Sequence, residues 1–228
     1  NLINYCLFEK FLAIAAIRMM NCDYNCIQNC VIRDKIQGIG VDMGGIGISA
    51  RPEAESRGNR IINNEIYNLT DAIGLIYNTD SKGNTEFDQK GFVPGTIIEN
   101  NDFYIEKSLY TIVDGEERAC AENAVDFKAG AGSDRPEDRI LFLNNRMWGF
   151  RPTDQSCGGS GSAGSGILLH MDASNYLLKG NIVFDVSQGV AVMGRHKRYP
   201  DAKVENIAFV NNLIYDVKDV APWNYNSG

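Results

Sequence analysis

Aspartate, lysine, histidine and arginine side chains occur in three short apolar stretches of this 228-residue chain. They are Asp126 and Lys128 in 124–130 (AVDFKAG), His170 and Asp172 in 166–172 (GILLHMD), and Arg195 in 189–195 (GVAVMGR). Lysine, histidine and carboxylate side chains transfer protons in enzymes, and arginine binds anionic groups. If the three stretches lie side by side, these residues form one site for acid–base chemistry.

Alternation along each stretch predicts which side chains share a surface. Val125 and Phe127 are the apolar positions of the first stretch, and we expect them to face a core. Asp126 and Lys128 then point to the opposite side. With adjacent strands about 4.8 Å apart, outward side chains of successive stretches become neighbours. The predicted neighbours are Lys128 with His170, and Asp172 with Arg195.

A longer repeat indicates that such stretches lie in parallel. Each copy has an alternating apolar stretch, an Asn, one free position, an apolar residue and an aromatic residue. The copies are 60–67 (RIINNEIY), 96–104 (TIIENNDFY), 140–148 (ILFLNNRMW), 176–184 (YLLKGNIVF) and 208–215 (AFVNNLIY), with weaker ones at 3–8 and 27–32. The aligned residues are Asn64, Asn101, Asn145, Asn181 and Asn212, at separations of 37, 44, 36 and 31. Each repeat therefore supplies one unit of strand, Asn turn, strand, loop and strand.

Short β-branched strands at a variable repeat length predict an all-β fold, a parallel β-helix or solenoid. We expect the aligned Asn residues to adopt the left-handed turn conformation and to hydrogen-bond along the axis. The alternative is an antiparallel sandwich with hairpins at the Asn pairs. Hairpins prefer Asn-Gly or Asp-Gly turns, and the sequence contains no Asn-Gly. We therefore predict a single β-helix domain over 1–228, as part of a longer chain.

Charge and composition limit the partners. The 22 Lys and Arg residues against 29 Asp and Glu give a net charge of −7, with a pI near 4.9. Such a chain lacks the clustered basic surface that nucleic acid requires. The longest apolar stretch, 11–20, includes Arg18 and is half as long as the roughly 20 residues of a membrane-spanning helix. We predict neither a nucleic-acid partner nor a membrane span.

Long polar segments flank the stretches that carry the charged residues. They are 80–94, 114–122, 130–139, 151–165 and 196–203. Loops at both edges of one sheet form the walls of a groove, and a groove lined by carboxylates and bases suits an extended polysaccharide. Cys120 and Cys157 lie in two of these segments. A disulfide between them would imply a secreted or cell-surface protein, and two free thiols are the alternative.

The repeat resembles that of the right-handed parallel β-helices of pectate-lyase-like proteins, over nearly the whole chain. Residues 123–130 (NAVDFKAG) are also similar to the strand that carries the catalytic Lys in the family-nine polysaccharide lyases. This resemblance implies β-elimination in an acidic, uronate-containing polysaccharide. The catalytic residues are then Lys128 as the base, His170 and Arg195, with Asp126, Arg151 and Asp172 binding substrate.

A lysine can act as a base only if it loses its proton near the working pH, which burial or a neighbouring cation favours. Arg51, Arg135, Arg151 or Arg195 could supply such a cation. Asp126 by itself would act the other way, because a carboxylate stabilises the ammonium form.

The family-nine enzymes also hold calcium through a cluster of Asp residues. The corresponding candidates here are Asp71, Asp80 and Glu122, with Asp126 as a further carboxylate. The middle of 71–78 is apolar, which departs from the family pattern. Calcium normally takes six to eight oxygen ligands, so a Ca²⁺ site here needs ligands from several loops.

A second class of function fits the same fold. Parallel β-helices also occur in adhesins, surface proteins and tail fibres, which bind glycans without cleaving them. The incomplete Asp cluster favours this non-catalytic class. The convergence of Lys128, His170, Asp172 and Arg195 favours the enzyme.

Overall fold

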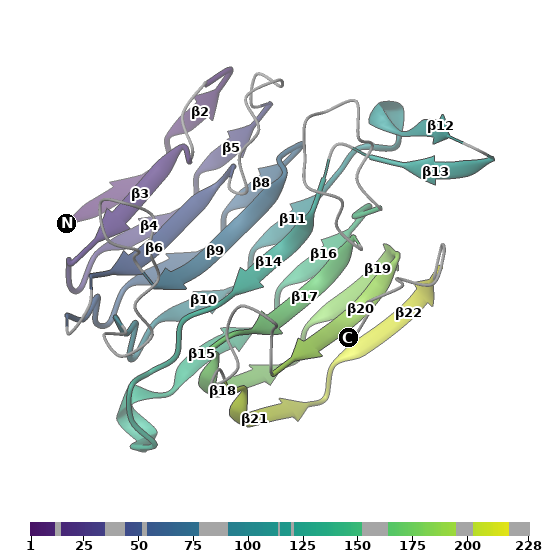
Figure 1. Ribbon diagram of the computed structural model, residues 1–228. Helices are drawn as coiled ribbons and strands as arrows, with labels where there is room; N and C mark the ends of the chain where they lie inside the picture. Colours follow the sequence, from purple (N-terminus) through teal and green to yellow (C-terminus); the bar gives the residue numbers. More distant parts are fainter. Residues whose placement is uncertain are drawn as a thin grey trace.

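The computed structural model describes most of the chain (Figure 1). The described residues are 1–11, 15–34, 44–51, 54–77, 91–113, 115–119, 121–151, 164–194 and 203–218. Within them, the chain forms three parallel sheets, one antiparallel hairpin and two short 3₁₀ helices.

Each of the first six repeats contributes one strand to each of three sheets, A, B and C, and the described residues of the seventh contribute one strand to A and one to B. Sheet A contains β1 (Leu2–Asn4), β4 (Cys26–Gln28), β7 (Arg60–Ile62), β10 (Ile97–Glu99), β15 (Ile140–Leu143), β18 (Ser174–Lys179) and β21 (Glu205–Val210). Sheet B contains β2 (Leu7–Glu9), β5 (Val31–Arg33), β8 (Glu65–Tyr67), β11 (Asp102–Tyr104), β16 (Arg146–Trp148), β19 (Ile182–Val186) and β22 (Leu213–Val217). Sheet C contains β3 (Ile17–Met20), β6 (Ile46–Ala50), β9 (Asp71–Tyr77), β14 (Asn123–Phe127), β17 (Ser165–His170) and β20 (Gln188–Met193).

The chain passes through sheets A, B and C in turn and then returns to A (Figure 1). Each new strand lies parallel to the strand of the previous repeat, as where Ile98 pairs with Ile61 on one side and Phe142 on the other. The predicted all-β fold with parallel sheets is confirmed. The arrangement is consistent with the predicted parallel β-helix.

One side of each sheet faces a common apolar core. In one repeat, Ile61 of sheet A, Ile66 of sheet B and Ile73 of sheet C have no exposed surface. Larger rings fill the middle of the core, where Phe127 packs edge-on against Phe142 at 5.4 Å. Burial of one such side chain stabilises the fold by about 1.5–3 kcal/mol. The repeating apolar positions therefore hold the three sheets together.

The turn between sheets A and B differs by one residue from the prediction. The left-handed conformation belongs to the residue before each aligned Asn, as at Asn63 (φ 54°), Asn100 (φ 56°) and Asn144 (φ 53°). A single left-handed residue is enough to turn the chain, and Asn tolerates it well. The next residue, the aligned Asn, is then free to direct its side chain along the stack of coils.

The aligned Asn residues form the predicted ladder of hydrogen bonds. Asn101 donates its backbone N–H and its side-chain amide to Asn145 Oδ1, both at 2.9 Å. Its amide also donates to the carbonyl of Ile61 at 3.0 Å. Asn64 makes the same contacts with Asn101, and Asn145 with Asn181. The turn's buried polar groups are thereby satisfied from one coil to the next, as burial requires.

The connections between sheets A and B have the same length in every repeat, whereas those to and from sheet C vary. Two residues join each A strand to its B strand, such as Asn63 and Asn64 between β7 and β8. The connections that lead into or out of sheet C differ in length between repeats. Some are long, as in 78–96, 128–139, 149–164 and 194–204, whereas a single residue, Ser187, joins β19 to β20. One of them, between β11 and β14, contains η1 (Lys107–Leu109) and the hairpin β12 (Thr111–Val113) and β13 (Glu116–Arg118). Another contains η2 (Pro136–Asp138). The edges of sheet C are therefore the variable part, as the groove prediction requires.

Asn145→Ala should destabilise the fold by about 3 kcal/mol, because it leaves the buried N–H groups of Asn101 without their acceptor. Asn144→Gly is the matched control one residue earlier, since glycine adopts the left-handed conformation without strain and should cost under about 1 kcal/mol. Chemical denaturation followed by circular dichroism measures both variants. Equal effects of the two substitutions would contradict the role given to the ladder.

Candidate functional site

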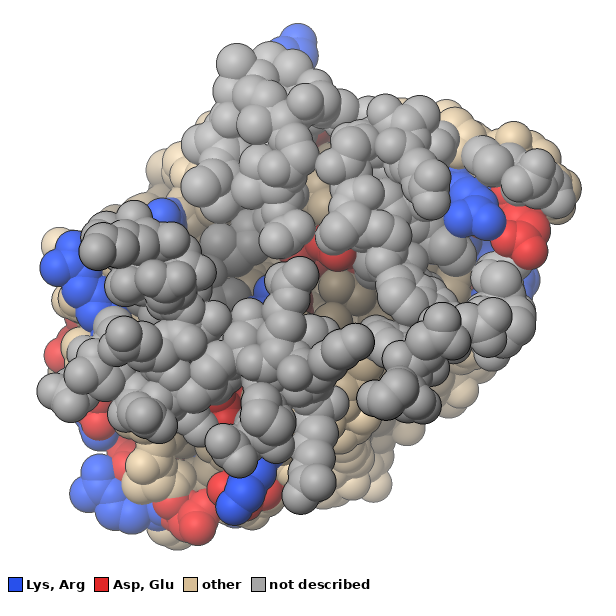
Figure 2. All heavy atoms as spheres, viewed as in Figure 1, with Lys and Arg blue, Asp and Glu red and all other residues tan. Residues whose placement is uncertain are grey.

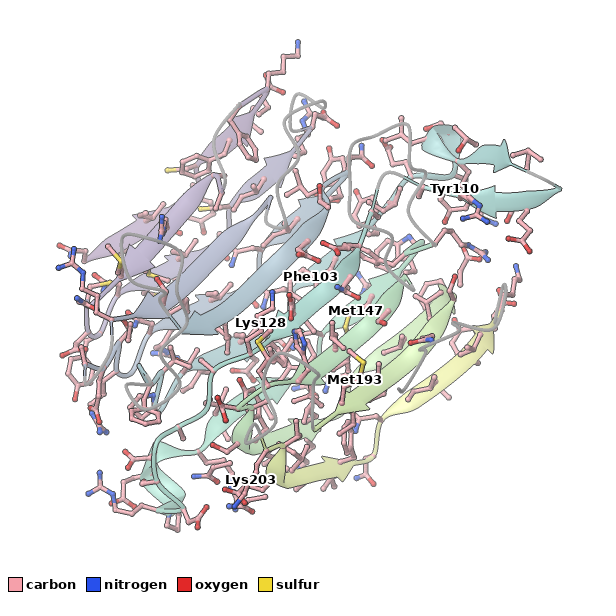
Figure 3. All side chains as sticks on the ribbon, in the orientation of Figure 1. Phe103, Tyr110, Lys128, Met147, Met193 and Lys203 are labelled. Carbon is pink, nitrogen blue, oxygen red and sulfur yellow. The ribbon has the colours of Figure 1, made fainter. Side chains whose placement is uncertain are left out.

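A charged cluster lies on the outer side of sheet C, at the end of β14, where Figure 3 labels Lys128. The carboxylate of Asp126 contacts two proton carriers. Its Oδ2 lies 2.6 Å from Lys128 Nζ, and its Oδ1 lies 2.6 Å from His170 Nε2. Asp126 is buried, whereas the side chains of Lys128 and His170 are 22% and 15% exposed. One buried carboxylate thus holds two groups at the surface that can exchange protons.

The strand pattern explains this convergence. Phe127 is fully buried in the core, so its neighbours Asp126 and Lys128 point to the other side of the sheet. β14 pairs with β17 so that Phe127 lies opposite Leu169. The next positions, Lys128 and His170, therefore lie level on adjacent coils. Asp126 is the residue that joins the two side chains.

Opposing effects determine the charge of Asp126. Burial disfavours its ionised form, but the positive charge of Lys128 and the hydrogen bond with His170 outweigh that penalty. Together they lower the pKa of Asp126 to about 2. Asp126 is therefore a carboxylate at neutral pH, and it can orient His170 through Nε2 as a buried carboxylate orients a catalytic imidazole.

A second carboxyl group lies near this cluster, and its pKa is shifted in the opposite direction to that of Asp126. Asp71 on β9 is fully buried, and its Oδ1 accepts the backbone N–H of Asn123 at 2.9 Å. Burial raises the pKa of Asp71 well above its usual range, and the charges of Asp126 and Glu122 add to this rise against the effect of Lys128. Asp71 thus favours its neutral form beside an ionised Asp126. Environments that separate two carboxyl groups in this way distinguish acids from bases in enzyme sites.

The predicted calcium ligands fit calcium poorly within the described residues. Both oxygens of Asp126 already have partners, and Asp71 favours its neutral form. Across those residues, no group of three or more His, Cys, Asp or Glu side chains is arranged to hold a metal ion. Asp80, the third predicted carboxylate, lies outside the described residues. The Ca²⁺ site predicted from Asp71, Asp80 and Glu122 stays a prediction.

The other residues predicted on sheet C are described only in part. Asp172 is buried in the turn after β17, and its backbone N–H donates to the carbonyl of Lys128 at 3.1 Å. It therefore lies next to the cluster. Its predicted neighbour Arg195 lies outside the described residues, as do Cys120 and Cys157. The Asp172–Arg195 contact and the disulfide stay predictions.

Arg151 belongs to a different cluster from Lys128. Its guanidinium is buried and donates to the Oδ1 of Asp185, and it lies 5.6 Å from the ring of Tyr110. Tyr110 donates its hydroxyl to Asp185 Oδ2 at 3.0 Å. Burial and the Asp185 charge raise the pKa of Tyr110. Sequence reasoning missed Asp185 and Tyr110, because they are joined across connections of different length and no local motif marks them.

Arg135, one of the cations considered for Lys128, also has partners elsewhere. Arg135 and Arg57 both pair with the buried carboxylate of Asp138, at 2.6 and 2.5 Å. A hydrogen bond from Ser133 and these two cations lower the pKa of Asp138 to about 2. Figure 2 shows this mixing of charge, with basic and acidic groups side by side around the rim of the face. Arg57 and Arg135 thus already have acidic partners within the fold.

Comparison with known proteins gives no match: no family model, no curated protein and no solved structure matches the chain. The pectate-lyase resemblance therefore rests on the repeat and on residues 123–130. Neither of the helices in the described residues has the length or apolar character needed to cross a membrane.

Asp71→Asn should raise stability relative to the unchanged protein, and the gain should grow with pH. A carboxyl group whose pKa is raised on folding contributes its full stability below about pH 4, the usual pKa, and loses it as pH rises. Asparagine keeps the acceptor for Asn123 and does not titrate. Melting temperatures of both proteins between pH 4 and pH 8 measure the difference. The exposed Asp134→Asn is the control for loss of one charge, and a constant difference for Asp71→Asn would contradict the assignment.

Proposed function

We propose that this protein is a secreted or cell-surface polysaccharide lyase with a right-handed, pectate-lyase-like β-helix. It cleaves an acidic, uronate-containing polysaccharide by β-elimination. The observation that carries the proposal is the Asp126 carboxylate shared by Lys128 and His170 on the outer side of sheet C. The long connections at the edges of sheet C support it, since an extended polymer needs walls there.

β-Elimination requires a base that removes the proton from the carbon next to the uronate carboxylate. The electron pair of that C–H bond forms a C=C bond, and the glycosidic C–O bond at the neighbouring carbon breaks. In the proposal, Lys128 takes the proton and His170 supplies one to the leaving oxygen. Both side chains reach the surface beside each other, as such a pair must.

Lys128 must be neutral to act as the base, and the ion pair with Asp126 opposes this. His170 counteracts that effect, because its Nε2 interacts with the same carboxylate. Asp126 provides one negative charge for two proton carriers. Because that charge is shared, it stabilises the ammonium form of Lys128 less than an unshared carboxylate would.

The substrate carboxylate needs a cation, because its charge grows as the proton leaves. In the proposal Arg195 supplies that cation, and Asp172 accepts hydrogen bonds from sugar hydroxyls. The guanidinium of Arg151 is buried against Asp185, so we assign Arg151 no direct contact with the substrate. Asp126 acts by orienting Lys128 and His170.

One observation favours the non-catalytic alternative, a β-helix adhesin, surface or tail-fibre protein that binds glycan. The 2.6 Å contact between Lys128 and Asp126 holds the lysine in the ammonium form, which cannot accept a proton. In that function Lys128 is a cation that contacts an acidic glycan. The two functions differ in whether Lys128 must change its charge.

Lys128→Ala and Lys128→Arg should each lower turnover of a uronate polymer by about 100-fold or more, the usual effect of removing a general base. Arginine retains the positive charge but stays protonated, so it cannot replace a base. The measurement is the absorbance of the unsaturated product at about 230–235 nm, with polygalacturonate and other polyuronates as substrates. Lys179→Ala, at an exposed position of sheet A, is the matched control and should keep full activity.

One result would contradict the enzyme assignment, and two others would contradict the role of Lys128 as its base. The unchanged protein could release no unsaturated product from any polyuronate. Lys128→Ala could retain more than about a tenth of the rate, which is too small a loss for a general base. Full activity in Lys128→Arg would make Lys128 a binding cation and not the base.

A further inference from the structure

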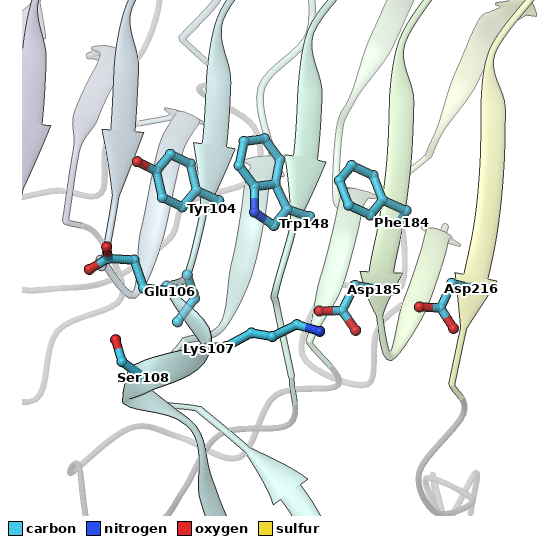
Figure 4. Close-up of a pocket in the computed structure, with 9 residues that line it drawn as sticks. Tyr104, Glu106, Lys107, Ser108, Trp148, Phe184, Asp185 and Asp216 are labelled. Atoms are coloured by element: carbon cyan, nitrogen blue, oxygen red, sulfur yellow. The ribbon is translucent and has the colours of Figure 1, made fainter.

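A pocket lies on the outer side of sheet B, away from the Lys128 cluster (Figure 4). The cavity is about 630 Å³, within the usual range of small-molecule sites. The rings of Tyr104, Trp148 and Phe184 line one side of it. The segment that contains η1 and the carboxylates of Asp185 and Asp216 line the other. This pocket has no part in the proposed elimination reaction.

The rings belong to a row that runs across five strands of sheet B. The row consists of Tyr67, Tyr104, Trp148, Phe184 and Tyr215, with successive centroid distances of 4.6, 4.4, 5.5 and 5.1 Å. Neighbouring ring planes are tilted by 3° to 11°. The residue before each of the first four rings, such as Phe103 before Tyr104, is fully buried in the core. The row is therefore the outward counterpart of the core.

The stacking decides which part of the rings a ligand can reach. Parallel rings separated by 4.4 and 4.6 Å leave no room for a group between them, since stacked carbon atoms need about 3.5 Å from each neighbour. The faces of the middle rings are thus covered, and their edges line the pocket. Ring edges carry the positive end of the aromatic quadrupole and attract oxygen atoms. The indole N–H of Trp148 is a further donor on such an edge.

The opposite wall is held in place before any ligand arrives. Asn68 donates its amide to Glu106 Oε2 at 2.8 Å, and Glu106 donates its backbone N–H to Asn68 Oδ1 at 3.1 Å. The buried Asp185 is fixed by Arg151, by the hydroxyl of Tyr110 and by Lys218 at 3.5 Å. Figure 4 shows Lys107 extending across the pocket toward Asp185. A wall fixed in this way costs little ordering entropy on binding.

We propose that this pocket binds a neutral oligosaccharide. Each sugar unit presents several hydroxyl groups, whose protons match a wall of carboxylates and whose oxygens match the opposite row of ring edges. The carboxylates Glu106, Asp185 and Asp216 accept hydroxyl protons, and the Trp148 edge donates to hydroxyl oxygens. The site is built from sheet B and the segment that contains η1, and it does not depend on the proposed lyase activity.

Charge favours a neutral ligand over an ionic one. Lys107 in the wall, and Arg151 and Lys218 at Asp185, nearly balance the carboxylates, so a polyanion gains little attraction. An organic cation would need the ring faces for a cation–π contact, and the stacking covers them. A neutral, hydroxyl-rich ligand uses both walls without an unpaired charge.

Calorimetric titration with cellopentaose, xylopentaose and mannopentaose tests the proposal, with oligogalacturonate and spermine as the charged probes. We expect saturable binding of at least one neutral pentaose at the unchanged protein. Trp148→Phe keeps the ring stack and removes the N–H, and Asp216→Asn removes one carboxylate. Each should weaken binding about tenfold, the effect of one hydrogen bond lost from a site.

Two control variants keep the test specific. Tyr67→Phe changes the same aromatic row outside the pocket and should leave the affinity unchanged, as should Lys128→Ala on sheet C. Failure of all three neutral sugars to bind would overturn the proposal, and so would a preference for oligogalacturonate or spermine. If Tyr67→Phe weakened sugar binding as much as Trp148→Phe, the aromatic row would act only as a structural element, and the proposal would be wrong. Loss of sugar binding in Lys128→Ala would show that the sugar binds at the Lys128 cluster and not in this pocket. Absence of lyase activity with sugar binding retained would contradict the proposed function and leave this proposal standing.

Discussion

The buried Asn ladder is the constraint on which the other features depend. Each rung satisfies the backbone and side-chain donors of one coil with an oxygen of the next, as between Asn101 and Asn145. A shift in register would leave these buried donors without acceptors, at about 1–3 kcal/mol for each group. The ladder also requires the same two-residue turn in every repeat. It therefore fixes the level of the strands in sheets A and B, and leaves variation to the connections around sheet C.

Fixed register turns single residues into rows of neighbours. Lys128 and His170 are held level on adjacent coils, where Asp126 contacts both, and the aromatic row arises from the same fixed register. Rows of apolar rings stabilise the fold by stacking. Charged side chains that are held close together need partners of opposite charge. Here the buried carboxylate of Asp126 contacts both Lys128 and His170. Burial and the charge of Asp126 raise the pKa of Asp71, which opposes a second negative charge beside Asp126.

Features that depend on a local pattern could be predicted from the sequence. The Asn repeat predicted the parallel sheets and the ladder, and alternation around Phe127 predicted that Asp126 and Lys128 leave the core. The left-handed residue was wrong by one position, because a row of adjacent Asn pairs offers two candidates for the same turn. The hairpin β12–β13 was also missed, although the Asp-Gly at 114–115 is a typical hairpin signal. The Arg151–Asp185 pair had no local signal, because it joins parts of the chain 34 positions apart.

The row of rings contacts the fold at one end and lines a pocket farther along. The connections between the strands determine which of the two occurs at each ring. At Tyr67 the outward ring meets Arg33, which donates to its hydroxyl at 2.9 Å, so this end of the row is closed by the fold itself. At Tyr104 and Trp148 the connection after β11 turns through η1 and forms a wall opposite the rings (Figure 4). A stacking row that the repeat supplies for stability thus becomes a pocket only where an inserted segment faces it. In sheet C the regular strands likewise hold Lys128 and His170 level, while the connections between these strands and the other sheets differ in length. In this fold the repeat positions the side chains, and the connections determine what can reach them.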